Sequence, residues 1–366
     1  MARSKPGHGL IRIGISGWTY APWRGAFYPA ELPQRRELEW ASRRFRSIEI
    51  NGTFYRLQQP ESFLRWHEET PDGFVFAIKG PRYVTHLRRL RDIETPLANF
   101  LASGVLRLGA KLGPMLWQFP PWMRFDAERF EPFLSMLPKD TEQACALARR
   151  HDARVAGGEA LKLDKHRPIR HAVEIRHDSF RSPEFIEMLR RHGVALVCAD
   201  TVDWPRLMDL TADFVYCRLH GSQELYVSGY DEASLDRWAA RVGAWADGSE
   251  PDDAERVMPP VPSRLEKRDV YVYFDNDVKV RAPVDAASLA ERLGVSPPPE
   301  WSSDEEAISS GAIGASTGRE SATAANGAGD EIAGEHEPTT LREVSARRSW
   351  PRARSSIHQP NRRSSP

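Results

Sequence analysis

Eight stretches of the chain have the pattern of β-strands, and most are separated by an amphipathic segment of helical length. The strands are expected at residues 10–18, 47–55, 74–80, 112–120, 170–177, 194–201, 214–221 and 268–277. Strands that alternate with helices form parallel sheets, and eight such units close into a (β/α)8 TIM barrel of the α/β class. The active site of such a barrel lies at the carboxyl ends of its strands. The sequence therefore predicts the place of a site before it indicates a reaction.

The segments between the strands carry helix signals such as a capping residue, an early proline or a final glycine. Only residues 203–213 separate the sixth strand from the seventh, so a single turn or short helix is expected there. The segment 247–267 is rich in proline and charge and predicts an exposed loop. Helices are expected at residues 34–45, 60–70, 93–108, 126–137, 140–156, 182–193, 231–246 and 285–294.

The domain organisation follows from a change of composition near Val295. Residues 1–9 are expected to be a flexible N-terminus, 10–294 the barrel, and 295–366 a disordered tail rich in Ser, Ala and Arg. The tail has too few large apolar residues to offset the entropy of ordering it. Its late arginines predict either a solvated end or a contact with RNA or an acidic partner.

Composition excludes several classes of protein. Lys plus Arg and Asp plus Glu both number 51, so no global charge favours nucleic acid or a membrane surface. No apolar run is long enough to span a bilayer, and the three cysteines show no C-x-x-C spacing. The N-terminus has no apolar stretch of a secretory signal. A cytoplasmic protein with no membrane partner is expected.

Side-chain parity places charged residues inside the barrel. In the second strand, Glu49 and Asn51 lie on the face opposite Ile48 and Ile50. The fifth and seventh strands repeat this pattern, and helices outside the barrel require apolar contacts. The polar sets must therefore point inward. They include Glu174 and Arg176 in the fifth strand, and Tyr216, Arg218 and His220 in the seventh.

These residues predict acid–base chemistry on an anion. Glu49 or Glu174 is expected as general base and His220 as acid or proton shuttle. Arginine and lysine donors suit phosphate or carboxylate oxygens. The substrate-binding candidates are Asn51, Lys79, Gln118, Arg176, Asp200, Arg218 and Asn276, with Trp18 and Tyr20 of the first loop as walls of the pocket.

Structural interpretations of the same residues stay open. Glu49, Glu174, Arg176 and Arg218 can form a buried ion-pair lattice that only holds the barrel together. His220 can be a satisfied core histidine, Asp200 a cap, and Lys79 a lysine that extends to solvent. The aromatic residues of the first loop can equally pack beneath it.

The chain resembles the YecE-like family of domain-of-unknown-function proteins. The motifs are 14-GISGWTYAPWRGAFYP, 49-EINGTFYRL, 76-FAIKGPRYVTH, 116-LWQFPP, 173-VEIRH, 217-CRLHG and 274-FDND, in order over about residues 11–293. The resemblance implies a TIM barrel and no assigned reaction. It also adds His86 and His177 to the candidates, although parity places His177 on the outer face or in a loop.

Three functions follow as alternatives. The first is an enzyme acting on a small phosphorylated, carboxylated or polyhydroxylated substrate. The second is a non-catalytic anion receptor or scaffold, and the third a barrel that processes nucleic acid with the first-loop aromatics. No cofactor is predicted, because no phosphate-binding or dinucleotide motif occurs. A divalent metal on Glu49, Glu174, Asp200 and His220 is a minor alternative, since the neighbouring arginines and lysine would repel it.

Overall fold

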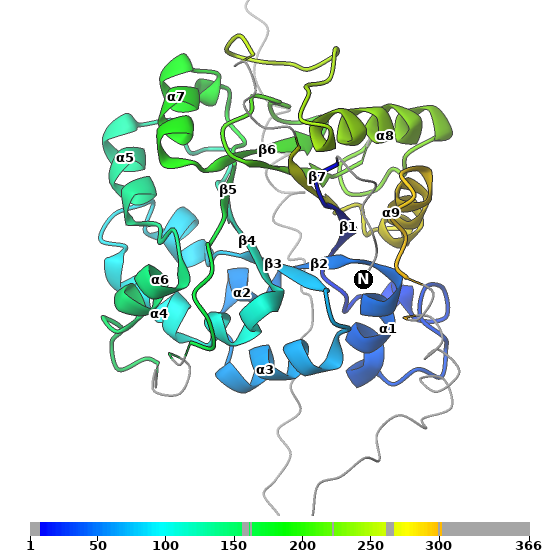
Figure 1. Ribbon diagram of the computed structural model, residues 1–366, viewed down its shortest axis with the longest axis horizontal. Helices are drawn as coiled ribbons and strands as arrows, with labels where there is room; N and C mark the ends of the chain where they lie inside the picture. Colours follow the sequence, from blue (N-terminus) through cyan, green and yellow to red (C-terminus); the bar gives the residue numbers. More distant parts are fainter. Residues whose placement is uncertain are drawn as a thin grey trace, which may run out of the picture. The chain divides into compact units, whose positions relative to one another are not determined.

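The fold is that of a closed parallel barrel, as predicted. A computed structural model of the chain describes residues 8–155, 161, 163–221, 223–260, 267–298 and 301. Each strand is hydrogen-bonded to the next, and β8 closes on β1 (Figure 1). The strands are β1 (Ile11–Ser16), β2 (Ser47–Ile50), β3 (Val75–Lys79), β4 (Leu112–Gln118), β5 (His171–Glu174), β6 (Ala195–Asp200), β7 (Phe214–Leu219) and β8 (Asp269–Phe274).

Helices lie around the strands and cover their outer faces (Figure 1). The α-helices are α1 (Glu37–Arg44), α2 (Gly52–Tyr55), α3 (Pro60–Glu69), α4 (Glu94–Ala102), α5 (Ala127–Met136), α6 (Thr141–Ala148), α7 (Pro183–His192), α8 (Glu232–Ala246) and α9 (Arg281–Arg292). Short helical turns are η1 (Ala21–Trp23), η2 (Gln34–Arg36), η3 (Tyr83–Leu87), η4 (Val105–Lys111) and η6 (Asp178–Phe180). Asp140 and Asp231 cap α6 and α8, each accepting from a backbone N–H three residues on.

Several predicted strands extend too far at their carboxyl ends. Residues 51–55 were expected to continue the second strand, but β2 ends at Ile50 and α2 follows. The hydroxyl of Thr53 donates to the carbonyl of Ile50 at 3.1 Å and to that of Lys79 at 2.7 Å. These two bonds turn the chain over the rim of the barrel and hold the end of β3.

Some helix boundaries also differ from the predictions. The helix α6 ends at Ala148, short of residue 156, and α9 begins at Arg281 rather than at residue 285. Residues 201–213, all of them described, contain no helix, so the sixth unit is only a loop. Residues 1–7, and all of the predicted tail except 295–298 and 301, lie outside the described residues.

The barrel interior is layered from bottom to top. At the amino end, Arg170 pairs with Asp269 at 2.6 Å and with Asp213 at 3.0 Å. A middle layer is apolar and aromatic, with the inner-facing residues Val75, Ala77, Leu116, Ala172, Ala195, Val197, Ala199, Phe214, Tyr216, Tyr271 and Tyr273. Above it, at the carboxyl ends of the strands, the interior becomes polar and charged. The fold therefore places one charged layer directly beneath the mouth.

We expect a chain that ends at Trp301 to keep the melting temperature of the full-length protein. A chain that ends at Gly294 should lose about 1–3 kcal/mol of unfolding free energy. The reason is Arg46, which donates to the carbonyls of Val295 and Ser296 at 2.7 Å each and lies 5.9 Å from the Trp301 ring. Thermal unfolding of the three chains measures this difference. Equal melting temperatures would instead put the boundary at Gly294, as composition predicts.

Candidate active site at the carboxyl face of the barrel

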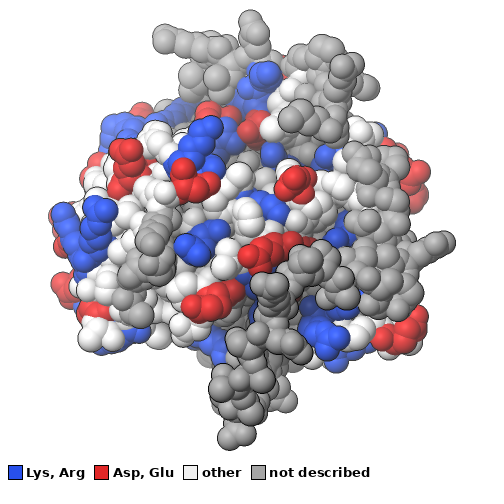
Figure 2. Space-filling model, turned by 60° about the horizontal axis from the view of Figure 1, so that its bottom comes forward, with Lys and Arg blue, Asp and Glu red and all other residues white. Residues whose placement is uncertain are grey.

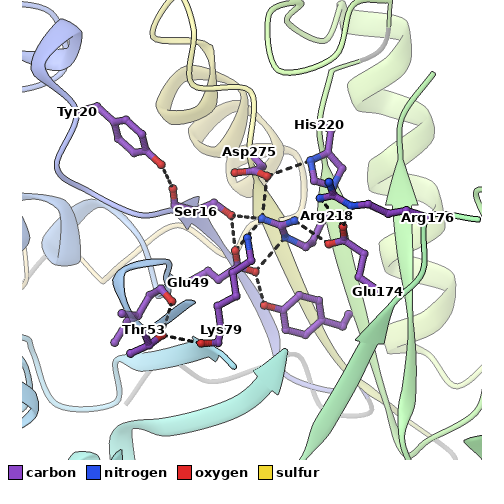
Figure 3. Close-up of polar contacts among 12 residues, drawn as sticks. Ser16, Tyr20, Glu49, Thr53, Lys79, Glu174, Arg176, Arg218, His220 and Asp275 are labelled. Atoms are coloured by element: carbon purple, nitrogen blue, oxygen red, sulfur yellow. Dashed lines mark hydrogen bonds and ion pairs between the residues drawn. The ribbon is translucent and has the colours of Figure 1, made fainter. Parts of the chain in front are cut away.

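Arg218 is the centre of the charged layer. Its side chain is fully buried, and its guanidinium donates to three carboxylates (Figure 3). Nη1 donates to Glu174 at 2.7 Å, and Nη2 donates to Glu49 and to Asp275 at 2.8 Å each. Nε donates to the second oxygen of Glu49 at 3.1 Å. One cation on β7 therefore holds acids from β2, from β5 and from the residue that follows β8.

Glu49 is saturated with donors. Its two oxygens accept from Arg218, from the Ser16 hydroxyl at 2.9 Å and from the Tyr216 hydroxyl at 2.6 Å. Glu174 is shared between Arg218 and Arg176, whose Nε donates to it at 2.7 Å. Both carboxylates are fully buried. Such groups are compensated charges with little capacity left to accept a proton.

The arginines also set the ionisation of the acids. Burial by itself would raise the pKa of Glu174, but Arg218 and Arg176 hold that pKa well below its usual range. Asp275 behaves alike, because Arg218 and His220 lower its pKa against the effect of burial. Both groups are therefore anionic at neutral pH.

Asp275 and His220 form a second pair at the mouth. Nδ1 of His220 lies 3.0 Å from Oδ2 of Asp275, and Nε2 has no hydrogen bond to a described residue. Burial and the charge of Arg218 lower the pKa of His220, while Asp275 opposes them. Asp275 was missed among the predicted residues. It shares the inner face with Tyr271 and Tyr273, so parity applied to the eighth strand would have identified it.

Lys79 extends from the end of β3 toward this cluster (Figure 3). It is 8% exposed, and its Nζ lies 4.6 Å from the centroid of the Phe54 ring. Burial first, and then Arg218, lowers the pKa of Lys79 to about 8. In the described part of the chain it makes neither a hydrogen bond nor an ion pair.

Further cations and aromatic rings surround the cluster. The Arg176 guanidinium lies 4.2 Å from the centroid of Trp204, whose ring also contacts His220. His86 of η3 packs edge-on against Phe54, and burial with the nearby cations lowers its pKa to about 3. Arg82, which sequence reasoning missed, is half-buried two residues after Gly80 and makes no hydrogen bond or ion pair among the described residues.

Three more predicted residues lie near the mouth. The Gln118 side chain, 6% exposed, ends β4 beside Glu174, and its Oε1 has no described partner. Asn51 follows β2, and its Oδ1 is likewise buried without a described partner. The Tyr20 hydroxyl donates to the Ser16 carbonyl at 2.6 Å, and burial together with Asp277 and Asp275 raises its pKa.

Four predicted residues do not join the cluster. Asp200 follows the inward Ala199, so its carboxylate faces outward to Arg206 at 3.1 Å and to Trp238 of α8 at 3.2 Å. Asn276 donates to Asp285 of α9 at 2.8 Å. Trp18 packs edge-on against Trp66 of α3, in the helical layer. His177 accepts from the amide of Ser179 at 3.0 Å and caps η6, which agrees with its loop parity.

The candidate site is identified by its cluster of charged side chains, and it does not coincide with the hollow found in the structure. A hollow of about 980 Å³ lies elsewhere, between the first loop, α1 and α9, and none of the clustered residues lines it. Within the described ranges, no group of three His, Cys, Asp or Glu side chains is placed to hold a metal ion. In the same ranges no helix has the length and hydrophobicity to cross a membrane.

The fold and the cluster together define a TIM-barrel protein with a charged carboxyl face. A family model described as "Protein of unknown function DUF72" matches residues 12–306, so the chain belongs to the DUF72 family. This confirms the resemblance drawn from the motifs. A crystal structure of a DUF72 family protein from Thermotoga maritima superposes with a TM-score of 0.58 at 24% identity, covering 78% of this chain and 99% of that one. One from Enterococcus faecalis gives 0.55 at 15% identity, over 79% and 98%.

The chain is also similar to curated proteins. It is 34% identical over 124 residues to the UPF0759 protein YecE of Escherichia coli K12, which covers 30% of this chain and 43% of YecE. It is 30% identical over 125 residues to the UPF0759 protein YunF of Bacillus subtilis, with 33% and 43% covered. The match thus spans less than half the length of either relative.

We expect the substitution Arg218→Met to cost about 3–5 kcal/mol of unfolding free energy at pH 7, because three buried carboxylates lose their shared cation. This cost should be smaller at pH 5 than at pH 7. In the wild type, Glu174 and Asp275 have lowered pKa values, so they stabilise the fold above about pH 4 and this stabilisation is lost as pH falls below it. Without Arg218 their pKa values rise in the fold, and protonation then relieves the variant. Urea unfolding at about pH 5 and pH 7 measures both effects.

Arg241→Met is the matched control. Arg241 is 7% exposed, but its partner Asp253 has a side chain that is 51% exposed. Solvent can compensate that carboxylate, so the loss should be about 1 kcal/mol and nearly independent of pH. Similar costs for the two variants would contradict a central role of Arg218.

Proposed function

We propose that this protein is an enzyme that moves a proton on a small anionic substrate at the carboxyl face of the barrel. His220 is the acid–base group, and Asp275 is the carboxylate that fixes the charge and orientation of its ring. Arg82 and Arg176, with Lys79 beside them, receive the phosphate or carboxylate group of the substrate.

The observation that carries the proposal is the state of His220. It is fully buried, and while Nδ1 faces Asp275 at 3.0 Å, Nε2 has no hydrogen bond to a described residue. Burying an unpaired polar group costs about 1–3 kcal/mol, so a purely structural histidine would be paired. His171 of β5 shows that pattern: one ring nitrogen lies 2.8 Å from the Pro138 carbonyl and the other accepts from Trp117 at 3.1 Å.

The ionisation of His220 fits a proton acceptor. Burial and Arg218 lower the pKa of its imidazole, so the ring is neutral near pH 7 and can accept a proton. The proton that it accepts is then stabilised by the anionic Asp275 at 3.0 Å. This arrangement is the familiar partnership of a histidine and a buried carboxylate in acid–base catalysis.

In this proposal the other predicted residues have different tasks from those first expected. Arg218 was expected to bind substrate, but its donors already serve Glu49, Glu174 and Asp275. Glu49 and Glu174, expected as bases, enter the proposal as the counter-ions that keep Arg218 in place. The ion-pair lattice and the active site are therefore adjacent layers of one structure, with the lattice below and the reactive groups above.

Two alternatives receive less support. A non-catalytic anion receptor needs only Lys79 and the arginines, and it leaves the unpaired Nε2 of His220 unexplained. A nucleic-acid enzyme would use the first-loop aromatics for stacking, but Trp23 is fully buried and Trp18 packs against α3. On the face shown in Figure 2, basic and acidic side chains are interspersed rather than gathered in one basic patch.

We expect His220→Gln to keep the melting temperature within a few degrees and to lower turnover about 10²- to 10⁴-fold. Substrates are found by incubating the protein in D2O with phosphorylated and carboxylated hydroxy and carbonyl compounds. NMR then follows the exchange of carbon-bound hydrogen and the formation of products.

His171→Gln is the matched control and should show the opposite behaviour. It breaks the contacts to Pro138 and Trp117, so the melting temperature falls while turnover per folded molecule persists. A His220→Gln protein as active as the wild type would refute the proposal. The proposal would also be refuted if ligands stabilise the wild type and none of them is converted.

A further inference from the structure

Lys79 and Lys111 are two buried lysines in opposite situations. Nζ of Lys111 donates to the carbonyls of His67 and Thr70 at 2.6 Å each and to the Thr70 hydroxyl at 3.1 Å. Lys79 is similarly buried, but in the described part of the chain its Nζ contacts only the face of Phe54. An ammonium group normally uses its three donors when it is buried. Lys79 is therefore held ready for something other than a protein acceptor.

The position of Lys79 is fixed at its backbone. Its carbonyl accepts from the Thr53 hydroxyl at 2.7 Å, and the amide of the next residue, Gly80, donates to the Leu116 carbonyl at 2.8 Å. A Cβ at Gly80 would lie 2.5 Å from the Trp117 ring, so only glycine lets the chain leave β3 along this path. The side chain then points toward Glu49 and Arg218 (Figure 3).

The surroundings disfavour the protonated amine. Burial first, and Arg218 second, lower the pKa of Lys79 to about 8. Roughly a tenth of such an amine is neutral at pH 7, against less than a thousandth for an ordinary lysine. Only the neutral amine is a nucleophile. A neighbouring cation increases the fraction of a lysine that is neutral, and enzymes are known to use this effect.

We infer that Lys79 forms a Schiff base with a small aldehyde or ketone that carries a phosphate or carboxylate group. This inference rests on the proposed function, because it names the substrate class of the same site. The geometric basis is the Nζ at a strand end, which has no hydrogen bond or ion pair among the described residues and is directed toward Glu49 and Arg218.

The reaction balances without an oxidant or a further reactant. The Nζ lone pair attacks the carbonyl carbon, a C–N bond forms, and the π electrons of the C=O bond move to its oxygen. That oxygen takes up protons and leaves as one water, and the nitrogen lone pair completes the C=N bond. In sum, the ammonium form of Lys79 and the carbonyl give an iminium ion and water. His220 is the group placed to carry the proton from nitrogen to the departing oxygen.

The charged layer suits an iminium ion. The iminium nitrogen keeps one hydrogen, and loss of that proton would give the neutral, less reactive imine, so nearby negative charge favours the reactive form. The carboxylates of Glu49, Glu174 and Asp275 each favour positive charge on Lys79. The iminium also acidifies the adjacent C–H bond, which gives His220 a proton to remove and joins this step to the proposed proton transfer.

Reductive methylation tests the nucleophile without knowledge of the substrate. The full-length protein is treated with ¹³C-formaldehyde and cyanoborohydride between about pH 6 and pH 10, and methylation is located by peptide mass spectrometry. At pH 7 Lys79 should be methylated at least tenfold faster than the exposed Lys139 and Lys165, with a rate that rises through about pH 8. Lys111, whose donors are used, should be the slowest. Methylation of Lys79 at or below the rate of the exposed lysines would overturn the inference.

Glyoxylate with borohydride tests the anionic carbonyl class. We expect a stable adduct on Lys79, none at that position in Lys79→Met, and a much slower adduct in Arg176→Met, in which the carboxylate loses a partner. Lys79→Met should lower the melting temperature by only a few degrees, because it removes compensating charge but no hydrogen bond of the described fold. If glyoxylate raises the melting temperature of the wild type but leaves Lys79 unmodified, the Schiff base is refuted while the proton-transfer proposal stands. An adduct on Lys79 together with unimpaired turnover in His220→Gln would support the Schiff base and refute the proposed role of His220 in proton transfer.

Discussion

A guanidinium group at the centre of a barrel is the constraint on which the rest of the site depends. Arg218 is fully buried, and a buried cation is tolerated only with close counter-charges and filled hydrogen-bond donors. Glu49, Glu174 and Asp275 meet that requirement, but three acids around one cation leave an excess of negative charge. Arg176 and Lys79 restore the balance from above. The charged residues at the mouth are therefore explained by the need to compensate the charge of Arg218 beneath them.

The same constraint makes the mouth rigid. The partners of Arg218 come from β1, β2, β5 and the segment after β8, so its hydrogen bonds cross the barrel rather than follow one strand. The Tyr216 and Tyr273 rings of the middle layer pack together, and their hydroxyls reach Glu49 and Ser47. Asp275, which faces His220 at 3.0 Å, is held by this network. That is the preorganisation that acid–base chemistry requires.

Sequence periodicity predicted the barrel, and parity predicted most of the charged layer, because both depend only on local geometry. The candidates chosen only for their place at a strand end, without regard to parity, do not all reach the charged layer. Asp200 and Asn276 follow inward residues and therefore face α8 and α9, although they stand at strand ends. The partners of Arg218 depend on contacts across the barrel, and no local pattern distinguishes an acid that neutralises an arginine from one that accepts a proton. Arg82 was missed because it lies beyond β3, where period-two alternation no longer applies.

Two buried histidines and two buried lysines differ in whether the fold uses their nitrogens, and this difference says more about their roles than burial does. His171 and Lys111 lie far from the mouth, and their nitrogens are used by the fold. His220 and Lys79 are as deeply buried, but within the described chain Nε2 of His220 and Nζ of Lys79 have no hydrogen bond. Selection for stability alone would favour replacing a group such as His220, because a buried nitrogen left without a hydrogen bond costs about 1–3 kcal/mol. Under the proposed function, a ligand at this end of the barrel offsets that cost, and the unpaired Oε1 of Gln118 lies above the same lattice.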